Sequence, residues 1–304
     1  MKKIYLILSH KNCEQLERQI RSLDDGYSTF YVHIDLKSNL HLFNSLGKMN
    51  NVFLISERVD CIWGDFSLVI ATLNLIENAL KNHTEGMCIF MSGNDYPIKS
   101  KSDINSFIDK NSDKIFIDIN EPKNIWKYFN RRIEYYRINL SSKRGNYTLL
   151  KGLNIKTLIQ YFLGRITREQ LHLIAFKKRK LSLITKFYGG SQWWAMNISN
   201  LAKMNNFIQS NKEELFDFFS YSNFPDEFFF HSIIMHLKEL GSPVKIESSL
   251  TYVSWSRKKC TLPVTFNIND LSELMEQPAN KLFARKFDLE FDRRILDEID
   301  KNIS

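Results

Sequence analysis

The stretch KIYLILSHKN, residues 3–12, decides the fold of this chain. Its apolar part predicts a buried β-strand, and the polar triplet Ser-His-Lys ends it too early for the hydrophobic core of a signal peptide. Apolar residues then recur at helical spacing over 13–23, and a second apolar run covers 29–34. A strand, a helix and a strand within about thirty residues predict a βαβ unit.

This alternation continues to about residue 120. Further strands are predicted at 51–55, 87–91 and 114–119, and further helices at 65–80 and from 103 onward. We therefore expect an α/β fold with a mostly parallel central sheet and helices on both faces. Ligands of such sheets bind at the carboxyl ends of the strands, which here carry Ser9-His10, His33-Ile34-Asp35, Ser92-Gly93-Asn94-Asp95 and Asp118.

The region 121–188 has a different character, because it is basic and aromatic. It predicts one or two amphipathic helices, for which two interpretations stay open. The basic side chains could form a solvated face on an inserted helical layer, or the segment near Phe176–Lys180 could attach to an anionic membrane surface. Beyond it we expect a strand at 191–196, helices at 198–209, after Pro225 and at 291–303, and strands at 244–246 and 250–253.

Composition limits the classes of partner. The chain has 304 residues, 43% of them hydrophobic, and a net charge of +8, which favours an anionic partner. No dense basic stripe or nucleic-acid motif is present, so nucleic acid is not expected. The four cysteines lack metal-ligand spacing and predict free thiols in a reducing compartment. No apolar run reaches the ~18–20 residues of a membrane-spanning helix.

The tripeptide Pro225-Asp226-Glu227 stands directly before three phenylalanines, 228–230. Proline and acidic residues are typical of a helix start, where the carboxylates offset the helix dipole. A carboxylate held beside apolar walls is also where a general base can be tuned. The sequence thus gives Glu227 two interpretations, and Asp226 is the better candidate for the capping residue.

The chain has no dinucleotide or P-loop motif, and no pair of aspartates is separated by one residue. Such a pair often holds the divalent metal of enzymes that use sugar nucleotides. Because this chain lacks the pair, Lys or Arg side chains would have to neutralise the negative charge of a leaving diphosphate. Two basic clusters qualify: residues 257–259 after Trp255, and Arg285-Lys286 between Phe283 and Phe287. On a helical turn the two phenylalanines would share a buried face, but a surface turn with exposed cations is an equal alternative.

Six short motifs occur in an order that carries a resemblance. They are His33-Ile34-Asp35, Trp63-Gly64, Ser92-Gly93-Asn94-Asp95-Tyr96-Pro97-Ile98, Gly190-Ser191-Gln192-Trp193-Trp194, Pro225-Asp226-Glu227 and Leu282-Phe283-Ala284-Arg285-Lys286-Phe287-Asp288. Over about residues 4–290 the chain resembles the core-2/I-branching β-1,6-N-acetylglucosaminyltransferases and peptide O-xylosyltransferases, glycosyltransferase family 14. The resemblance implies a GT-A-type fold and an inverting, metal-independent transfer from a UDP-sugar, with no cofactor.

The resemblance also implies roles for individual residues. Glu227 would be the general base. Ile7, Asp35, Trp63, Arg257 and Lys286 would bind the nucleotide, with Lys286 on the diphosphate. Asp95, Arg131, Arg132, Gln192, Trp193, Asp226 and Trp255 would bind the donor sugar or the acceptor. The family's second diphosphate cation falls opposite Val264, where this chain departs from the pattern, and Arg257 or Lys258 would replace it.

We therefore expect a single GT-A-like catalytic domain over 1–304. Its parts would be a nucleotide-binding half at 1–120, a basic helical insertion at 121–188, and at 189–304 an acceptor and catalytic half that ends in the diphosphate-binding segment. The donor would be N-acetylglucosamine or, second, xylose, and the acceptor a hydroxyl of a glycan or a lipid-linked oligosaccharide. We expect a bacterial cytoplasmic enzyme, with a peripheral position on the inner face of the membrane as the second alternative. The alternative is a non-catalytic carbohydrate- or nucleotide-binding protein on the same fold.

Overall fold

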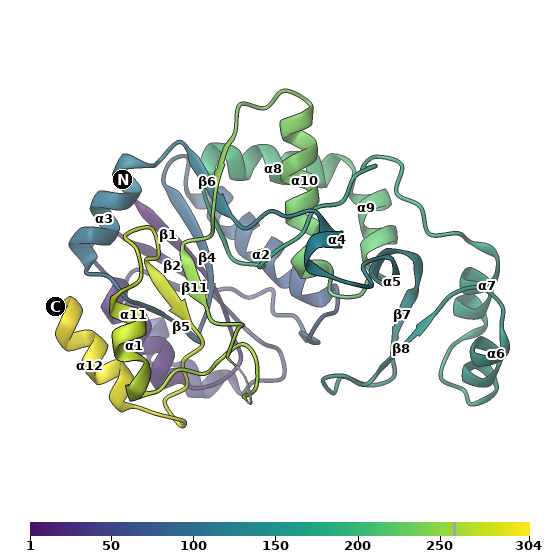
Figure 1. The fold of residues 1–304 in the computed structure, drawn as a ribbon, viewed down its shortest axis with the longest axis horizontal. Helices are drawn as coiled ribbons and strands as arrows, with labels where there is room; N and C mark the ends of the chain where they lie inside the picture. Colours follow the sequence, from purple (N-terminus) through teal and green to yellow (C-terminus); the bar gives the residue numbers. More distant parts are fainter. Residues whose placement is uncertain (258–259) are drawn as a thin grey trace.

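The structure, a computed structural model, describes residues 1–257 and 260–304 (Figure 1). A seven-stranded sheet forms its centre in the order β10-β6-β9-β4-β1-β2-β3. The strands are β1 (Lys3–Ser9), β2 (Thr29–Ile34), β3 (Val52–Leu54), β4 (Met87–Ser92), β6 (Lys114–Ile117), β9 (Trp194–Asn197) and β10 (Lys245–Glu247). Only β9 runs antiparallel to its neighbours, β4 and β6, so the expected mostly parallel sheet is confirmed.

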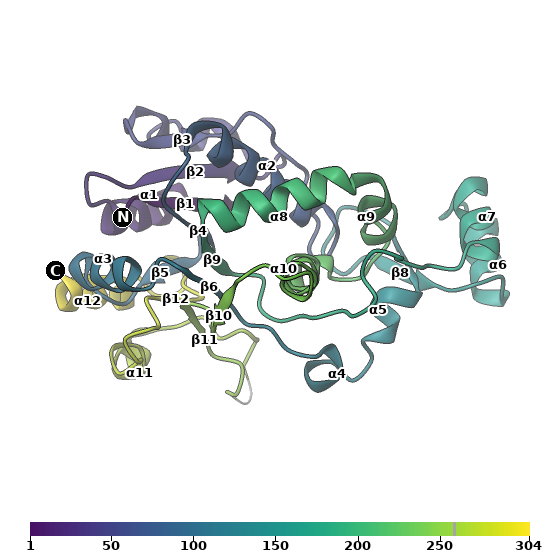
Figure 2. The same cartoon turned by 90° about the horizontal axis from the view of Figure 1, so that it is seen from above.

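Alternate residues of β1 explain why helices cover both faces. Ile4 and Leu6 point into one apolar core, and Tyr5 and Ile7 into another, because successive side chains of a strand leave opposite faces. The first core is closed by α2 (Ser67–Asn82), α8 (Ile198–Ser210), α9 (Lys212–Phe219) and α10 (Phe229–Glu239). The second is closed by α1 (Cys13–Leu23) and α3 (Lys101–Lys110). Figure 2 shows α8 and α10 on the opposite side of the sheet from α3.

The C-terminal segment adds a small second sheet, β11-β12-β5, against the first half of the chain. Its strands are β5 (Asp95–Pro97), β11 (Thr251–Val253) and β12 (Phe283–Arg285), and α11 (Leu271–Met275) and α12 (Arg294–Ile303) pack beside them. Residues 283–285 are therefore a strand and not the helical turn considered above, although Phe283 and Phe287 are both fully buried.

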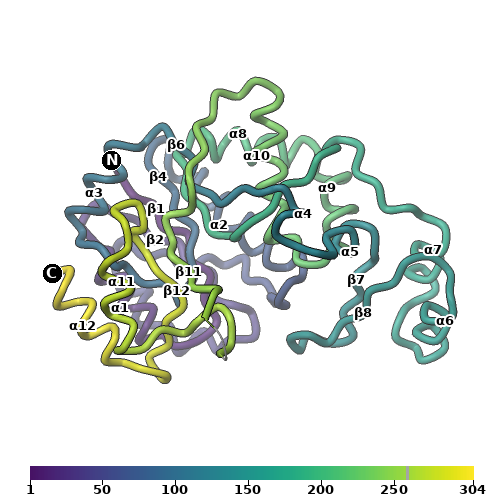
Figure 3. The backbone as a smooth tube through the Cα atoms, in the orientation of Figure 1, coloured from purple at the N-terminus to yellow at the C-terminus, as the bar shows by residue number. Residues whose placement is uncertain are grey.

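The sequence predicted only helices in the region 121–188, but the structure contains strands there as well. Besides α4 (Pro122–Ile125), α5 (Asn130–Glu134), α6 (Ile155–Phe162) and α7 (Arg168–Phe176), it contains a hairpin of β7 (Tyr136–Asn139) and β8 (Tyr147–Leu150). The hairpin carries the chain away from the sheet, and α6 and α7 stand apart at the far end of the molecule (Figure 3). No helix in the described parts of the chain is long and apolar enough to cross a membrane.

Candidate active site

Glu227 ends a short 3₁₀ turn, η3 (Pro225–Glu227), directly before α10. The predicted helix start is therefore confirmed. The role of Asp226 as its cap is wrong, since neither η3 nor α10 has a side-chain cap hydrogen bond. Phe224 leads into the turn with φ 57°, a left-handed conformation that is unusual for a bulky residue.

Arg132 holds the carboxylate of Glu227. Its Nη1 lies 2.5 Å from Oε2 of Glu227, whose side chain is 32% exposed. The guanidinium lies between two rings, 3.8 Å from the centroid of Trp126 and 5.0 Å from that of Phe224. Stacking of this kind fixes the orientation of an arginine as well as its charge. Arg132 thus positions Glu227 and is largely buried, which does not favour its predicted contact with the acceptor.

Asp226 is the buried partner of Glu227. Its Oδ1 is buried without a hydrogen-bond partner among the described residues. Burial, and next the charge of Glu227, raise the pKa of Asp226 to about 8. The raised pKa of Asp226 follows from the cost of ionising a second carboxyl next to Glu227 in an apolar site.

A pair of glycines lets the backbone of this turn approach the sheet. The amide of Gly190 donates to the carbonyl of Glu227 at 3.0 Å. A Cβ at Gly190 would lie 1.9 Å from the carbonyl oxygen of Asp118, and one at Gly189 would lie 2.5 Å from the ring of Trp126. His231 supports the same segment, because its Nε2 donates to the carbonyl of Ser191 at 2.9 Å. This contact gives His231 a packing role.

Trp63 lies beside the turn, on the other side of Phe224. Their rings meet edge to face, with centroids 4.6 Å apart, and the amide of Phe224 donates to the carbonyl of Gly64 at 2.8 Å. Arg137, on β7, is buried and joins these pieces, since it donates to the carbonyls of Trp63 and Gly64 and to Asn223. A cavity of about 590 Å³ opens here, lined by Trp63, Arg131, Tyr135, Gly145, Tyr147, Thr148, Leu149 and Lys156.

Cations gather at the end of β12. Burial, and then the positive charges of Arg285, Arg144 and Lys11, lower the pKa of Lys286. Arg144 comes from the tip of the β7–β8 hairpin, with its guanidinium carbon 4.3 Å from the centroid of Trp63. Asp288 offsets these charges only in part, because it pairs with Lys11 at 2.7 Å. A group of like charges in one place favours an anionic ligand.

His10 connects this cationic group to Asp35. The pKa of His10 is lowered by burial first, and among the nearby charges are Lys11, Asp35 and Lys286. The carboxyl ends of β1 and β2 are adjacent, since Ser9 pairs with Ile34. Asp35 is nearly buried, and its carboxylate accepts hydrogen bonds from the amides of Lys37 and Cys61 at 2.9 and 3.2 Å. The structure thus brings together Asp35 and Lys286, two residues predicted to bind the nucleotide.

Several predicted contacts lie in the interior instead. Ile7 and Asp95 are fully buried, and Trp193 is 4% exposed. Arg285 covers Trp193, with its guanidinium carbon 4.2 Å from the ring centroid, and its Nε lies 3.5 Å from Oδ1 of Asp95. Asp95 and Trp193 thus hold the C-terminal segment on the sheet.

Arg257, the predicted replacement for the missing cation, is engaged in ion pairs in this structure. Its guanidinium pairs with Asp270 and Glu273, each at 2.8 Å, so two carboxylates already balance its charge. Lys258 lies outside the described residues. Val264 is buried, and its amide and carbonyl bond to the backbone of Ser254 and Lys286. Arg144 and Lys11, which the sequence analysis did not single out, are further cations near Lys286.

The remaining predicted residues stay predictions. Trp255 is 59% exposed in the loop after β11, and Gln192 is half-buried next to the Gly189-Gly190 pair.

In the described ranges, 1–257 and 260–304, no group of three or more His, Cys, Asp or Glu side chains is arranged to hold a metal ion.

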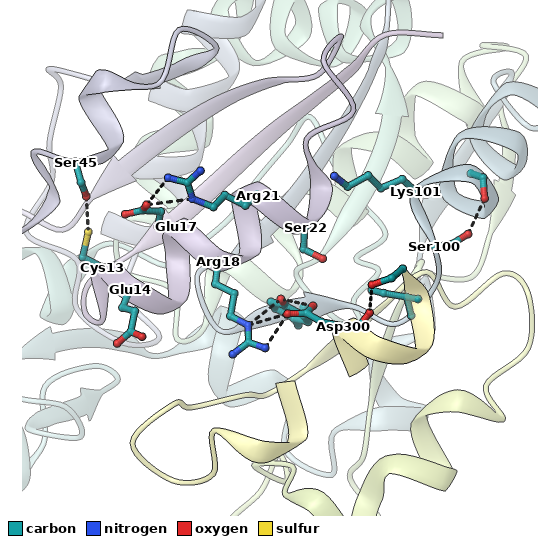
Figure 4. Close-up of a pocket in the computed structure, with 14 residues that line it drawn as sticks. Cys13, Glu14, Glu17, Arg18, Arg21, Ser22, Ser45, Ser100, Lys101 and Asp300 are labelled. Atoms are coloured by element: carbon teal, nitrogen blue, oxygen red, sulfur yellow. Dashed lines mark hydrogen bonds and ion pairs between the residues drawn. The ribbon is translucent and has the colours of Figure 1, made fainter. Parts of the chain in front are cut away.

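A separate groove of about 1140 Å³ lies between α1, α3 and α12 (Figure 4). Arg18 dominates it and is tied to Asp297 and Asp300, at 2.7 Å each. None of the predicted site residues lines this groove. Its ion pairs join the C-terminal helix to α1, which is a structural role.

Comparison with known proteins decides the family. The sequence model of the core-2/I-branching enzyme family matches residues 4–275. The chain belongs to the core-2/I-branching enzyme family. The predicted resemblance and its GT-A-type fold are confirmed. The chain is therefore a glycosyltransferase domain.

Curated relatives agree with this family. The chain is 24% identical to xylosyltransferase 2 of Mus musculus over 317 aligned residues, which cover 97% of this chain and 33% of the relative. It is 23% identical to xylosyltransferase 1 of Rattus norvegicus and 24% to xylosyltransferase oxt of Drosophila melanogaster, with 97% of this chain covered in both. The chain spans about a third of the length of these relatives.

The contact of Gly190 with Asp118 leads to a stability prediction. Gly190→Ala forces the backbone apart and should lower the free energy of unfolding by about 3 kcal/mol. Denaturant unfolding measures the change. Gly47→Ala is the control, because a Cβ there has open space. Equal stability of the two variants would contradict the close approach.

The buried carboxyl of Asp226 predicts a pH-dependent stability. Its pKa in the folded state is raised, so its contribution is present at low pH and is lost as pH rises through about 8. Asp226→Asn removes this ionisation, and the variant should lose less stability than the wild type between about pH 4 and 8, the ordinary and the raised pKa of this carboxyl, by on the order of 1 kcal/mol per pH unit.

Thermal unfolding across this pH range measures the difference. Asp217→Asn is the control, because Asp217 is half exposed and pairs with Lys177 on the surface. Parallel pH profiles of the wild type and Asp226→Asn would show that Asp226 does not titrate in this range.

Proposed function

We propose that this domain transfers a sugar from a UDP-sugar to a hydroxyl of a glycan or lipid-linked acceptor, with inversion and without a metal ion. The observation that carries the proposal is the η3 turn, where Glu227 stays accessible while Arg132 and buried Asp226 fix its position and charge. Inversion requires one base on the acceptor side, in contrast to the paired carboxylates of glycoside hydrolases.

Glu227 would act through its free oxygen. Arg132 engages Oε2, which leaves Oε1 to accept the proton of the acceptor hydroxyl. The hydroxyl oxygen forms a bond to the anomeric carbon while the bond from that carbon to the diphosphate breaks, and UDP leaves on the opposite face. The proton ends on Glu227. Base catalysis of this kind contributes on the order of 10²–10⁴-fold to the rate.

The departing diphosphate would be stabilised by side chains. Lys286 and Arg144 supply positive charge near the carboxyl ends of β1 and β2, where nucleotides bind on open α/β sheets. Fixed cations stabilise charge that develops on a leaving group. Metal independence is supported by the absence of an aspartate pair of the D-x-D type in the sequence.

The cavity beside Trp63 suits the acceptor. It combines exposed aromatic surface with Arg131 and Lys156, and its Trp63 packs on Phe224, which leads into the turn of Glu227. Aromatic faces pack on sugar C–H surfaces, and the cations would favour an acidic or phosphate-bearing acceptor. Arg131 would therefore contact the acceptor, as the sequence predicted.

The donor and the compartment are proposed from other observations. The resemblance described under Sequence analysis favours N-acetylglucosamine, and the names of the relatives favour xylose. Four free thiols fit a reducing compartment such as the cytoplasm. A non-catalytic sugar- or nucleotide-binding protein is the second candidate, and the variants below separate it from an enzyme.

Glu227→Gln tests the base. The variant should bind UDP as the wild type does, because the uncharged amide keeps the size of the side chain, and transfer should fall on the order of 10²–10⁴-fold. UDP release from UDP-N-acetylglucosamine and UDP-xylose measures transfer, and calorimetry measures UDP binding. Glu85→Gln, at an exposed position, is the control. Unchanged transfer in Glu227→Gln would rule out the role of the base.

Lys286→Ala tests the cationic leaving-group site. It should weaken UDP binding and lower transfer on the order of 10²–10³-fold, because a preorganised charge is lost. Lys101→Ala, at an exposed position on α3, is the control. We expect activity in EDTA to equal that without it, and activity that returned only with Mn²⁺ would contradict the metal-independent mechanism.

A further inference from the structure

Helix α6 (Ile155–Phe162) exposes its apolar side chains. The residues that it buries include Thr157 and Gln160, whereas Ile155 is 78% exposed and Phe162 is 81% exposed. Leu158 and Ile159 fall on the same outward face, because each lies three or four residues from Ile155 and from Phe162. A surface helix of a globular protein normally shows the reverse arrangement.

The exposed surface continues beyond the helix. Its members are the "α6 patch": Leu153, Ile155, Leu158, Ile159, Phe162 and Leu163, each at least 37% exposed. Single exposed apolar residues are ordinary, but a contiguous group marks an interaction surface. The α6 patch is also at the far end of the molecule, where two perpendicular views show α6 and α7 away from the central sheet (Figures 1 and 2).

Positive charge surrounds the α6 patch. Residues 151–180 hold eight basic residues and one acidic residue, a net charge of +7 in a chain whose total is +8. Exposed members of this set are Lys156, Arg165, Arg168, Lys178 and Lys180. Arg179 is the exception, because it turns inward and donates to the carbonyl of Tyr135 and to Ser222, which fixes the base of the α6–α7 segment.

We propose that the α6 patch docks on an anionic lipid leaflet. The apolar side chains would enter the boundary between headgroups and acyl chains, and the surrounding Lys and Arg side chains would contact the headgroups. A second copy of the chain is a poorer occupant, because it would bring the same +7 charge against this one. Docking does not require sugar transfer, so it stands apart from the proposed function.

The test is flotation of the purified protein with vesicles of phosphatidylcholine, alone or mixed with phosphatidylglycerol. We expect binding to the mixed vesicles, little to the neutral ones, and weaker binding as salt is raised. The double variant Ile159→Ser/Phe162→Ser should lower the partition coefficient about tenfold or more, because two large apolar side chains no longer leave water. Leu42→Ser/Phe291→Ser is the matched control, since both residues are at least 60% exposed elsewhere.

Each other outcome overturns the proposal. Equal binding to neutral and anionic vesicles, or equal loss in the control variant, would show that the α6 patch and its charges are not the lipid contact. A dimer in light scattering that dissociates in Ile159→Ser/Phe162→Ser would assign the surface to a second copy. Absence of binding to either vesicle would leave a protein partner as the occupant. UDP-release activity, measured in parallel without vesicles, reports separately on the proposed function.

Discussion

The close contact between the Gly189-Gly190 segment and the η3 turn is the constraint on which the site depends. One hydrogen bond joins the amide of Gly190 to the carbonyl of Glu227, and the carbonyl of Asp118 occupies the space that a side chain would need. The distance between the central sheet and the start of α10 is therefore set by backbone atoms. Because backbone packing is stiffer than side-chain packing, the carboxylate of Glu227 is held by the fold itself.

The polar contacts around that turn are arranged in two layers. Arg132 and Asp226 act directly on Glu227, one by an ion pair and the other by remaining neutral. Arg137 acts from further away, because it fastens Trp63, Gly64 and Asn223 around Phe224. Burying an arginine costs free energy unless its N–H groups are hydrogen-bonded. The N–H groups of Arg137 donate to the carbonyls of Trp63 and Gly64 and to the side chain of Asn223.

The sequence predicted the sheet well, because apolar runs and helical spacing report burial directly. It predicted the position of Glu227 for the same reason, since Pro225 and the three phenylalanines mark a helix start. The two motifs that contain Asp95 and Trp193 did not show that both side chains are buried against Arg285, because that contact depends on where the C-terminal strand packs. Arg144 could not be predicted, because it lies in a polar turn and becomes significant only through the hairpin that brings it to Trp63.

Phe224 has a consequence for attempts to make this protein more heat-resistant. A common strategy replaces residues of positive φ by glycine, which removes backbone strain. At this position the ring is the surface on which Trp63 and Arg132 rest. Glycine would relax one residue and leave a hole beneath two others, so the strained phenylalanine is the better choice for the folded state as a whole.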